Sequence, residues 1–262
     1  MDKKLYIALA LVIVLIAVAL IVTSSNSASQ QSLAPYINAQ VPQSVVSKLL
    51  IPASVSNKIG IGSAQYYPKQ ISGYGSLASG GKPEILYIGA NYCPYCAVTR
   101  WGMIIALLRF GNFTNLKYMA SNGSDVFPNT PTFTFANATY TSPYITFVSV
   151  ETTTRNRNVA LQTPTPFENA LFVKFNPQGG IPFIDFANQS LQLSAPILPS
   201  TLQGQTWNST IANLTNSNTS VSQAVVGSGD MFTAQICMIT NNTPQSVCAQ
   251  QYVLNIEKNN LG

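Results

Sequence analysis

Two cysteines separated by two residues lie where an apolar segment meets a segment with helical spacing. Cys93 and Cys96 follow the apolar residues 85–90, and Pro94 suits the first position of a helix. A cysteine at a helix start is favoured as a thiolate, because unpaired backbone N–H groups and the positive end of the helix dipole lie beside it. The second cysteine, one turn later, can resolve a mixed disulfide formed by the first. The spacing therefore predicts a redox-active dithiol, with Cys93 as the accessible attacking thiol and Cys96 as the resolving thiol.

A CxxC motif has two other common roles, as half of a zinc site or as an inert disulfide. Zinc would need two more ligands, but the chain has no histidine, and its other cysteines, Cys237 and Cys248, are separated by ten residues rather than two to four. The sequence therefore predicts no metal site and no organic cofactor. An inert disulfide between Cys93 and Cys96 remains the main alternative to redox chemistry.

The composition excludes several other classes of protein. Hydrophobic residues make up 46% of the 262 residues, enough for a core, whereas charged residues make up only 8%. The net charge of +5 is spread thinly without a basic cluster, so we expect no nucleic-acid binding. Without histidine, the chain has no Ser/His or Cys/His catalytic arrangement.

A second motif accompanies the CxxC and gives the sequence a family resemblance. Ile181 and Pro182 precede the apolar residues 183–186, a polar turn at 187–190 and a short segment at 191–193. With the Cys-Pro-Tyr-Cys motif, this order resembles the thioredoxin-like superfamily, and the motif itself is most similar to that of glutaredoxins. The similarity covers residues 84–121 and 180–193.

The resemblance implies a set of site residues. It implies that Pro182 is a cis-proline next to Cys93 and shapes the substrate groove, and that Ile181 offers main-chain hydrogen bonds there. It also implies substrate contacts by Tyr92, Pro94 and Tyr95. These three residues are in or beside the CxxC motif.

The sequence departs from the family at one position. Thioredoxins and related periplasmic oxidases carry an acidic residue six positions before the first cysteine, and it handles protons during exchange. That position here is Tyr87, and Glu84 stands at a different offset. The sequence therefore has no acidic residue at the position of the family's proton-transfer group.

The elements around these motifs predict an α/β protein with a thioredoxin-like fold. We expect a buried strand from Glu84, a helix from Pro94 with an apolar face, and a strand at 116–120 that returns to the same sheet by a right-handed crossover. The predicted domain spans 43–195 and contains a long insertion at 122–166 before the cis-proline strand. Residues 144–151 form a possible strand within that insertion. A helical C-terminal extension is expected at 196–262.

The N-terminal segment predicts a membrane anchor at residues 1–22. The apolar run 5–22 would span about 27 Å as a helix, close to the thickness of a bilayer core. Lys3 and Lys4 precede the run, which places everything after it outside the cell membrane in a single-pass topology. A cleavable signal peptide is the competing interpretation. Residues 23–42, uncharged and rich in Ser, Gln and Asn, are predicted to be a flexible linker.

Eight Asn-x-Ser/Thr sites follow the anchor and agree with an external, glycosylated domain. They are Asn112, Asn122, Asn137, Asn188, Asn208, Asn213, Asn218 and Asn241. The whole chain also resembles membrane-anchored archaeal proteins of unknown function with a thioredoxin-like core.

Cys237 and Cys248 are predicted to form a structural disulfide. The turn 241–244 is centred between them, so antiparallel helices at 231–240 and 245–257 would bring the two cysteines level. The alternative is that this pair relays electrons to Cys93 and Cys96.

Two functions remain. The first is a membrane-anchored, extracytoplasmic thiol–disulfide oxidoreductase that acts on cysteines of exported proteins and needs an unidentified redox partner. The second is a non-catalytic, glycosylated surface or binding module that keeps the fold.

Overall fold

The structure, a computed structural model, describes residues 33–261 and is a mixed α/β arrangement. Its largest sheet has six strands, in the order β1-β10-β9-β3-β2, and β8 also pairs with β3. Two further pairs, β4 with β7 and β5 with β6, form small separate sheets. From Tyr36 to the C-terminus the chain is one compact unit.

The strands are β1 (Lys69–Gln70), β2 (Ala78–Ser79), β3 (Lys82–Gly89), β4 (Asn112–Thr114), β5 (Lys117–Ala120), β6 (Pro131–Thr134), β7 (Thr139–Thr141), β8 (Thr146–Glu151), β9 (Phe183–Phe186) and β10 (Ser190–Gln192). The α-helices are α2 (Gln43–Val46), α3 (Ala53–Ile59), α4 (Pro94–Leu108), α5 (Pro166–Phe175), α6 (Trp207–Asn213), α7 (Ser220–Ile239), α8 (Gln245–Cys248) and α9 (Gln251–Ile256). Short helical turns are η1 (Ser47–Leu49), η2 (Pro199–Leu202) and η3 (Glu257–Leu261).

Strand β3 is the centre of the main sheet. It pairs in parallel with β8 and antiparallel with β9, and β9 turns back into β10. The second half of β3 is buried, as expected for a strand with helices on both faces. Glu84 to Gly89 of β3 align with Thr146 to Glu151 of β8, so Gly89 and Glu151 are opposite each other at the end of both strands.

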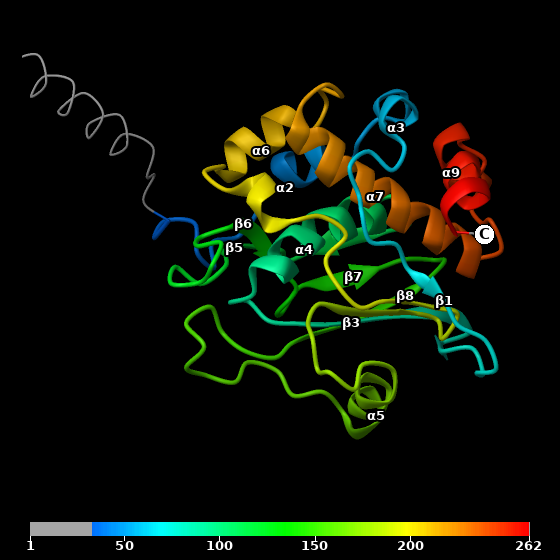
Figure 1. Cartoon of the computed structure of the whole chain (residues 1–262), viewed down its shortest axis with the longest axis horizontal. Coiled ribbons are helices and arrows are strands. Elements are labelled where there is room, and N and C mark those ends of the chain that lie inside the picture. Colours follow the sequence, from blue (N-terminus) through cyan, green and yellow to red (C-terminus); the bar gives the residue numbers. More distant parts are fainter. Residues whose placement is uncertain (1–32, 262) are drawn as a thin grey trace, which may run out of the picture. The chain divides into compact units, whose positions relative to one another are not determined.

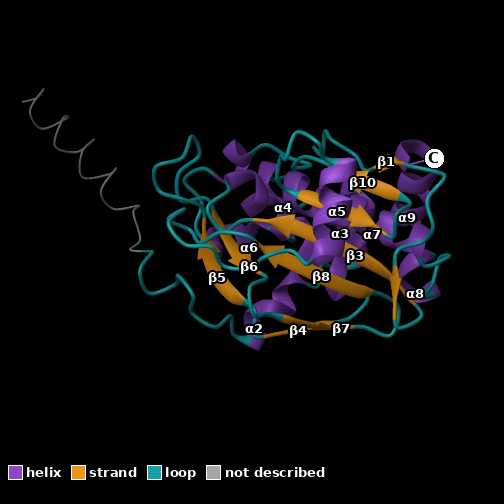
Figure 2. Cartoon of the chain, turned by 90° about the horizontal axis from the view of Figure 1, so that it is seen from below, coloured by secondary structure: helices purple, strands orange, loops and turns teal. Residues whose placement is uncertain are grey.

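Helices cover both faces of this sheet. Figure 1 shows α4 and α7 on one side of the strands and α5 on the other, and Figure 2, seen from below, shows α5 lying across them. Under α5 lies an apolar cluster that includes Leu86, Ile88, Phe183 and Leu171. On the opposite face, Phe186 of β9 contacts Phe232 of α7.

The predicted crossover from the CxxC helix to residues 116–120 is wrong. In the structure β5 pairs with β6, outside the main sheet, and the parallel partner of β3 is β8. The proposed insertion at 122–166 therefore contains a strand of the central sheet. Two parallel strands can be joined by a crossover of any length above about a dozen residues. The next strand along the chain is therefore not necessarily the one that pairs with β3.

The segment 196–262 is helical as predicted, with α6, α7, α8 and α9, and it packs with the preceding residues in one compact unit. Helix α7 packs along α4, and 17 of its 20 residues are buried. Its small residues are the reason for this close packing: a Cβ atom on Gly229 would lie 2.6 Å from Cγ2 of Ile105 on α4. Residues 220–230 read as polar in the sequence because serine and glycine line the contact with α4.

The N-terminal predictions fall largely outside the described residues. The predicted anchor at 1–22 lies there entirely, as does the first half of the linker at 23–42. Within 33–261, no helix combines the length and apolar character needed to cross a membrane. The end of the predicted linker is packed rather than free, because the N–H of Asn38 donates to the carbonyl of Tyr118 and Val41 is buried.

Candidate redox site

The CxxC motif lies at the junction of β3 and α4. Cys93 is the N-cap residue of α4 and has an extended backbone, and Pro94 takes the first helical position, where its missing N–H costs nothing. The backbone N–H of Cys96 donates to Sγ of Cys93 at 3.1 Å. Sγ of Cys93 therefore occupies the position of a capping oxygen and receives an N–H from the first turn.

Cys93 and Cys96 are free thiols in the structure, and their environments differ. Cys93 keeps 5% of its surface exposed, whereas Cys96 has none, so Cys93, the predicted attacking thiol, is less accessible than the sequence suggested. Hydrogen bonding from Cys96 lowers the pKa of Cys93, and burial opposes this effect. Burial raises the pKa of Cys96 well above its usual range. The Cys93 thiol therefore ionises more easily than a free cysteine, whereas the Cys96 thiol stays protonated.

The second sequence motif faces the first. The Ile181–Pro182 peptide bond is cis and immediately precedes β9. Sγ of Cys93 donates a long hydrogen bond, 3.8 Å, to the carbonyl of Ile181. The structure thus brings together four of the predicted site residues, Cys93, Cys96, Ile181 and Pro182, from segments almost ninety residues apart.

The predicted aromatic contacts surround this junction. Tyr95 is 41% exposed and meets the ring of Phe127 edge to face. Tyr92 is half-buried beneath the guanidinium of Arg157, which lies 4.3 Å from the ring centroid. Arg157 also forms an ion pair with Asp125. Of the two aromatic side chains, Tyr95 is the one open to an approaching chain.

Tyr87, at the position where thioredoxins carry an acid, is buried in the second half of β3, near the motif. Its side chain is fully buried, and its hydroxyl has no hydrogen-bond partner. Gly89, two residues along β3, leaves room for it: a Cβ atom there would lie 2.3 Å from the Tyr87 oxygen. Burial raises the pKa of Tyr87 well above its usual range, so this phenol stays neutral.

Sequence reasoning missed a buried ion pair beside Tyr87. Arg100 of α4 and Glu151 of β8 are both fully buried and joined by two hydrogen bonds, of 2.8 and 2.6 Å. One signal was available: Arg100 is the only charged residue in the helix that starts at the CxxC, in a chain with only 8% charged residues. Glu151 gave no such signal, because the strand expected at 144–151 was assigned to an insertion and its pairing with β3 was not predicted.

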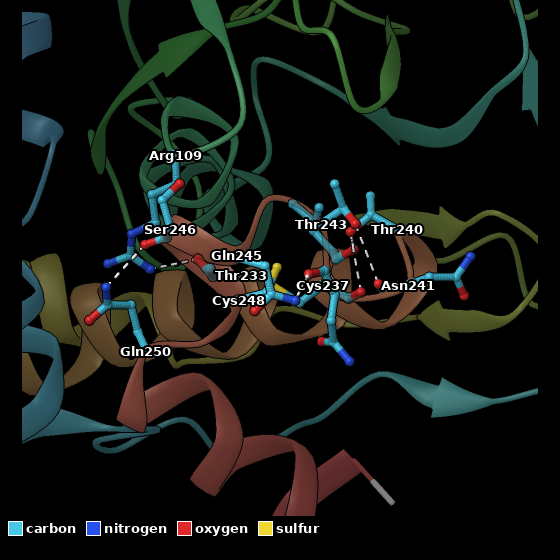
Figure 3. Close-up of a disulfide and its surroundings, with 12 residues drawn as sticks. Arg109, Thr233, Cys237, Thr240, Asn241, Thr243, Gln245, Ser246, Cys248 and Gln250 are labelled. Atoms are coloured by element: carbon cyan, nitrogen blue, oxygen red, sulfur yellow. Dashed lines mark hydrogen bonds between the residues drawn. A yellow bond between two sulfur atoms is a disulfide. The ribbon is translucent and has the colours of Figure 1, made fainter.

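The other cysteine pair lies apart from this site. Cys237, in α7, and Cys248, the last residue of α8, are joined by a disulfide with a Cα–Cα distance of 5.5 Å (Figure 3). Both are buried. The helices are not as predicted: α7 begins at Ser220, and the second segment is broken into α8 and α9. The cysteines still meet, because the turn at Asn241 and Asn242 reverses the chain with two positive φ angles.

Candidate metal ligands do not gather around the motif. Within the described part of the chain, no three acidic or cysteine side chains lie close enough together to hold a metal ion.

The division between the two thiols gives a pH-dependent expectation. Because the pKa of Cys93 is lowered, its thiolate should form at a lower pH than that of a free cysteine, about 8.5. The rate at which iodoacetamide labels Cys93 should therefore reach half of its maximum below that pH, with no labelling of Cys96 in the folded protein. Mass spectrometry of digested protein would locate the label. Labelling of Cys96 first would contradict the assignment of roles.

Comparison with known proteins gives a family and no activity. No curated protein and no solved structure matches the chain. One family model, described as a domain of unknown function (DUF929), matches residues 70–238. This match includes the main sheet, the CxxC helix, the cis-proline strand and nearly all of α7, which is more than half of the chain. The protein belongs to this family of domains of unknown function.

Proposed function

We propose that the protein is a thiol–disulfide oxidoreductase with a thioredoxin-like fold. The observation that carries the proposal is the contact between the two motifs: Cys93, the N-cap of α4, meets the carbonyl that precedes cis-Pro182. β9 then turns back into β10, as the resemblance implies. A cysteine sulfur that accepts a hydrogen bond at a helix start and faces a main-chain carbonyl can take part in thiol–disulfide exchange.

In this proposal the cysteines have separate tasks. The Cys93 thiolate attacks, or Cys93 is the sulfur attacked by a substrate thiolate. Cys96 resolves the mixed disulfide. Pro182 and Ile181 shape the groove in which the substrate backbone lies, and Tyr95 contacts the substrate, while Tyr92 and Pro94 support the motif from within.

We also propose that the domain acts outside the cell on cysteines of exported proteins, tethered by the segment at 1–22. Lys3 and Lys4, which precede the apolar run 5–22 of that segment, support this orientation. The sequons agree with it, because none of their asparagines is buried. Five of them are exposed: Asn112, Asn137, Asn208, Asn218 and Asn241. A redox partner would have to restore the motif after each turnover.

Two observations favour the second candidate, a non-catalytic binding module. Cys93 is only 5% exposed, and a neutral Tyr87 replaces the acid that its relatives use. Such a module would keep the fold and the CxxC without turning over.

A turnover assay separates the two functions. A reduced, unfolded protein with two cysteines is incubated with oxidised glutathione and a small amount of the full-length chain. The oxidoreductase should accelerate disulfide formation, and the variant Cys93→Ser/Cys96→Ser should not. Equal rates with the parent and the variant would favour the binding module.

A further inference from the structure

A buried ion pair lies beneath the CxxC motif. Arg100 follows Cys96 by four residues on α4, so the two side chains lie on the same face of the helix, one turn apart. Glu151 ends β8, directly opposite Gly89 at the end of β3. Nε and Nη2 of Arg100 each donate to a different oxygen of Glu151, and neither side chain is exposed. A buried ion pair gains little or no net stability over apolar packing. Stability alone therefore does not explain why this pair lies next to the CxxC motif.

Arg100 also binds the turn that carries Cys93. Its Nη2 donates to the carbonyl of Ala90 at 2.7 Å. The same carbonyl accepts the backbone N–H of Cys93 at 3.2 Å. The guanidinium is therefore linked through one shared acceptor to the first cysteine, and its position is fixed by the carboxylate of Glu151.

The charge of Arg100 acts on both cysteines. The pKa of Cys93 is lowered first by its hydrogen bond from Cys96, and the charge of Arg100 lowers it further. The pKa of Cys96 is raised by burial, and Arg100 opposes that rise. Tyr87 covers the pair with a ring whose centroid is 6.0 Å from Cζ of Arg100, which keeps water away and strengthens the interaction between charges.

We propose that the Arg100–Glu151 pair sets the balance between the dithiol and disulfide states of Cys93 and Cys96, with Arg100 favouring the dithiol. This inference rests on the proposed redox function. Arg100 acts here as a positioning residue, since it holds a charge and a backbone turn next to the reacting sulfur. Glu151 fixes the position of Arg100 and partly offsets the effect of its positive charge on the cysteines.

The step that Arg100 favours is oxidation of a substrate dithiol. Two electrons pass from the two substrate thiols to the Cys93–Cys96 disulfide, whose S–S bond breaks while a substrate S–S bond forms. Of the two substrate protons, one ends on the Cys96 thiol and the other goes to solvent, and Cys93 is left as a thiolate. Because Arg100 stabilises this thiolate, it makes the motif a stronger oxidant.

The two partners of the pair should have effects of opposite sign. Arg100→Met removes the cation, so the Cys93 pKa should rise and the disulfide should become harder to reduce. Glu151→Gln leaves the cation without its counter-charge, so the Cys93 pKa should fall and the disulfide should become easier to reduce. Arg100→Lys keeps a charge and should stay closer to the parent than Arg100→Met. A pair that only supported the fold would change stability without this pattern.

The test is equilibration of the full-length chain with mixtures of reduced and oxidised glutathione. After an acid quench and alkylation, mass spectrometry gives the fraction of Cys93–Cys96 disulfide. Arg100→Met should lower the equilibrium constant for reduction at least tenfold, which corresponds to about 30 mV for two electrons. Glu151→Gln should shift it the other way. If Glu151→Gln does not fold, the contrast between Arg100→Met and Arg100→Lys decides.

The chain supplies a matched control at the other end of α4. Arg109, just after α4, forms a similar buried pair with Asp230 of α7, at 2.7 Å, but it lies at the opposite end of the helix from the cysteines. Arg109→Met should lose stability and keep the parent equilibrium constant. Equal constants for the parent and Arg100→Met, or equal shifts in Arg100→Met and Arg109→Met, would overturn this inference alone. A parent that never exchanges with glutathione would overturn the proposed function as well.

Discussion

Replacing Cys93 by alanine should abolish thiol–disulfide exchange, whereas replacing Cys96 should trap the protein in mixed disulfides with its substrates. The structure gives the reason for this asymmetry. Sγ of Cys93 receives the N–H of Cys96 and contacts the carbonyl before Pro182, at the mouth of the predicted groove. Cys96 is fully buried, so it can react only with the mixed disulfide that a substrate sulfur has already formed with Cys93.

The expected loss in Cys93→Ala is at least a hundredfold in exchange rate, down to that of the buffer, because the one free thiol left among residues 33–261, Cys96, is fully buried. In Cys96→Ala the first attack still occurs, but the resolving sulfur is missing. Non-reducing gels of the variants mixed with an oxidised substrate protein would show the adducts. Adducts that form through Cys96 in the Cys93→Ala variant would reverse the assignment of the two roles.

The second large effect concerns stability. Replacing both Cys237 and Cys248 by serine should lower the free energy of unfolding by roughly 3 kcal/mol, the value expected for opening a loop of about a dozen residues. The bond joins α7, the helix packed on α4, to the C-terminal helices, and both sulfurs are buried. Urea unfolding of the two proteins, followed by circular dichroism, measures the difference.

The control for this experiment is Cys93→Ser/Cys96→Ser, which should change exchange much more than stability. If the Cys237→Ser/Cys248→Ser variant unfolds at the same urea concentration as the parent but loses turnover, the pair is an electron relay and not a structural bond. Intact turnover with reduced stability is the expected result.

The parts of the site that could be predicted are those encoded by short, local patterns. A proline after Cys93 and apolar residues before it are enough to predict a strand, a cap and a helix, which the structure contains as β3 and α4. The order of Ile181, Pro182 and an apolar run predicted the strand β9 and its hairpin with β10.

The parts that could not be predicted depend on contacts between distant segments. β8 lies far along the chain from β3, and its alternating pattern does not name a partner. Gly102 and Gly229 lie where α4 and α7 approach closely, and in a sequence they resemble helix breakers. The ion pair of Arg100 with Glu151 could not be predicted for the same reason, because the strand expected at 144–151 was assigned to an insertion and not to a position beside β3.

The central claim is that Cys93 and Cys96 form a redox-active pair, and a glutathione titration of the unmodified full-length chain tests it most directly. The fraction of each disulfide is measured by alkylation and mass spectrometry across the ratio of reduced to oxidised glutathione. We predict a single two-electron transition for Cys93–Cys96, while Cys237–Cys248 stays oxidised throughout. A Cys93–Cys96 pair that remains entirely disulfide or entirely dithiol over the whole range would contradict the account.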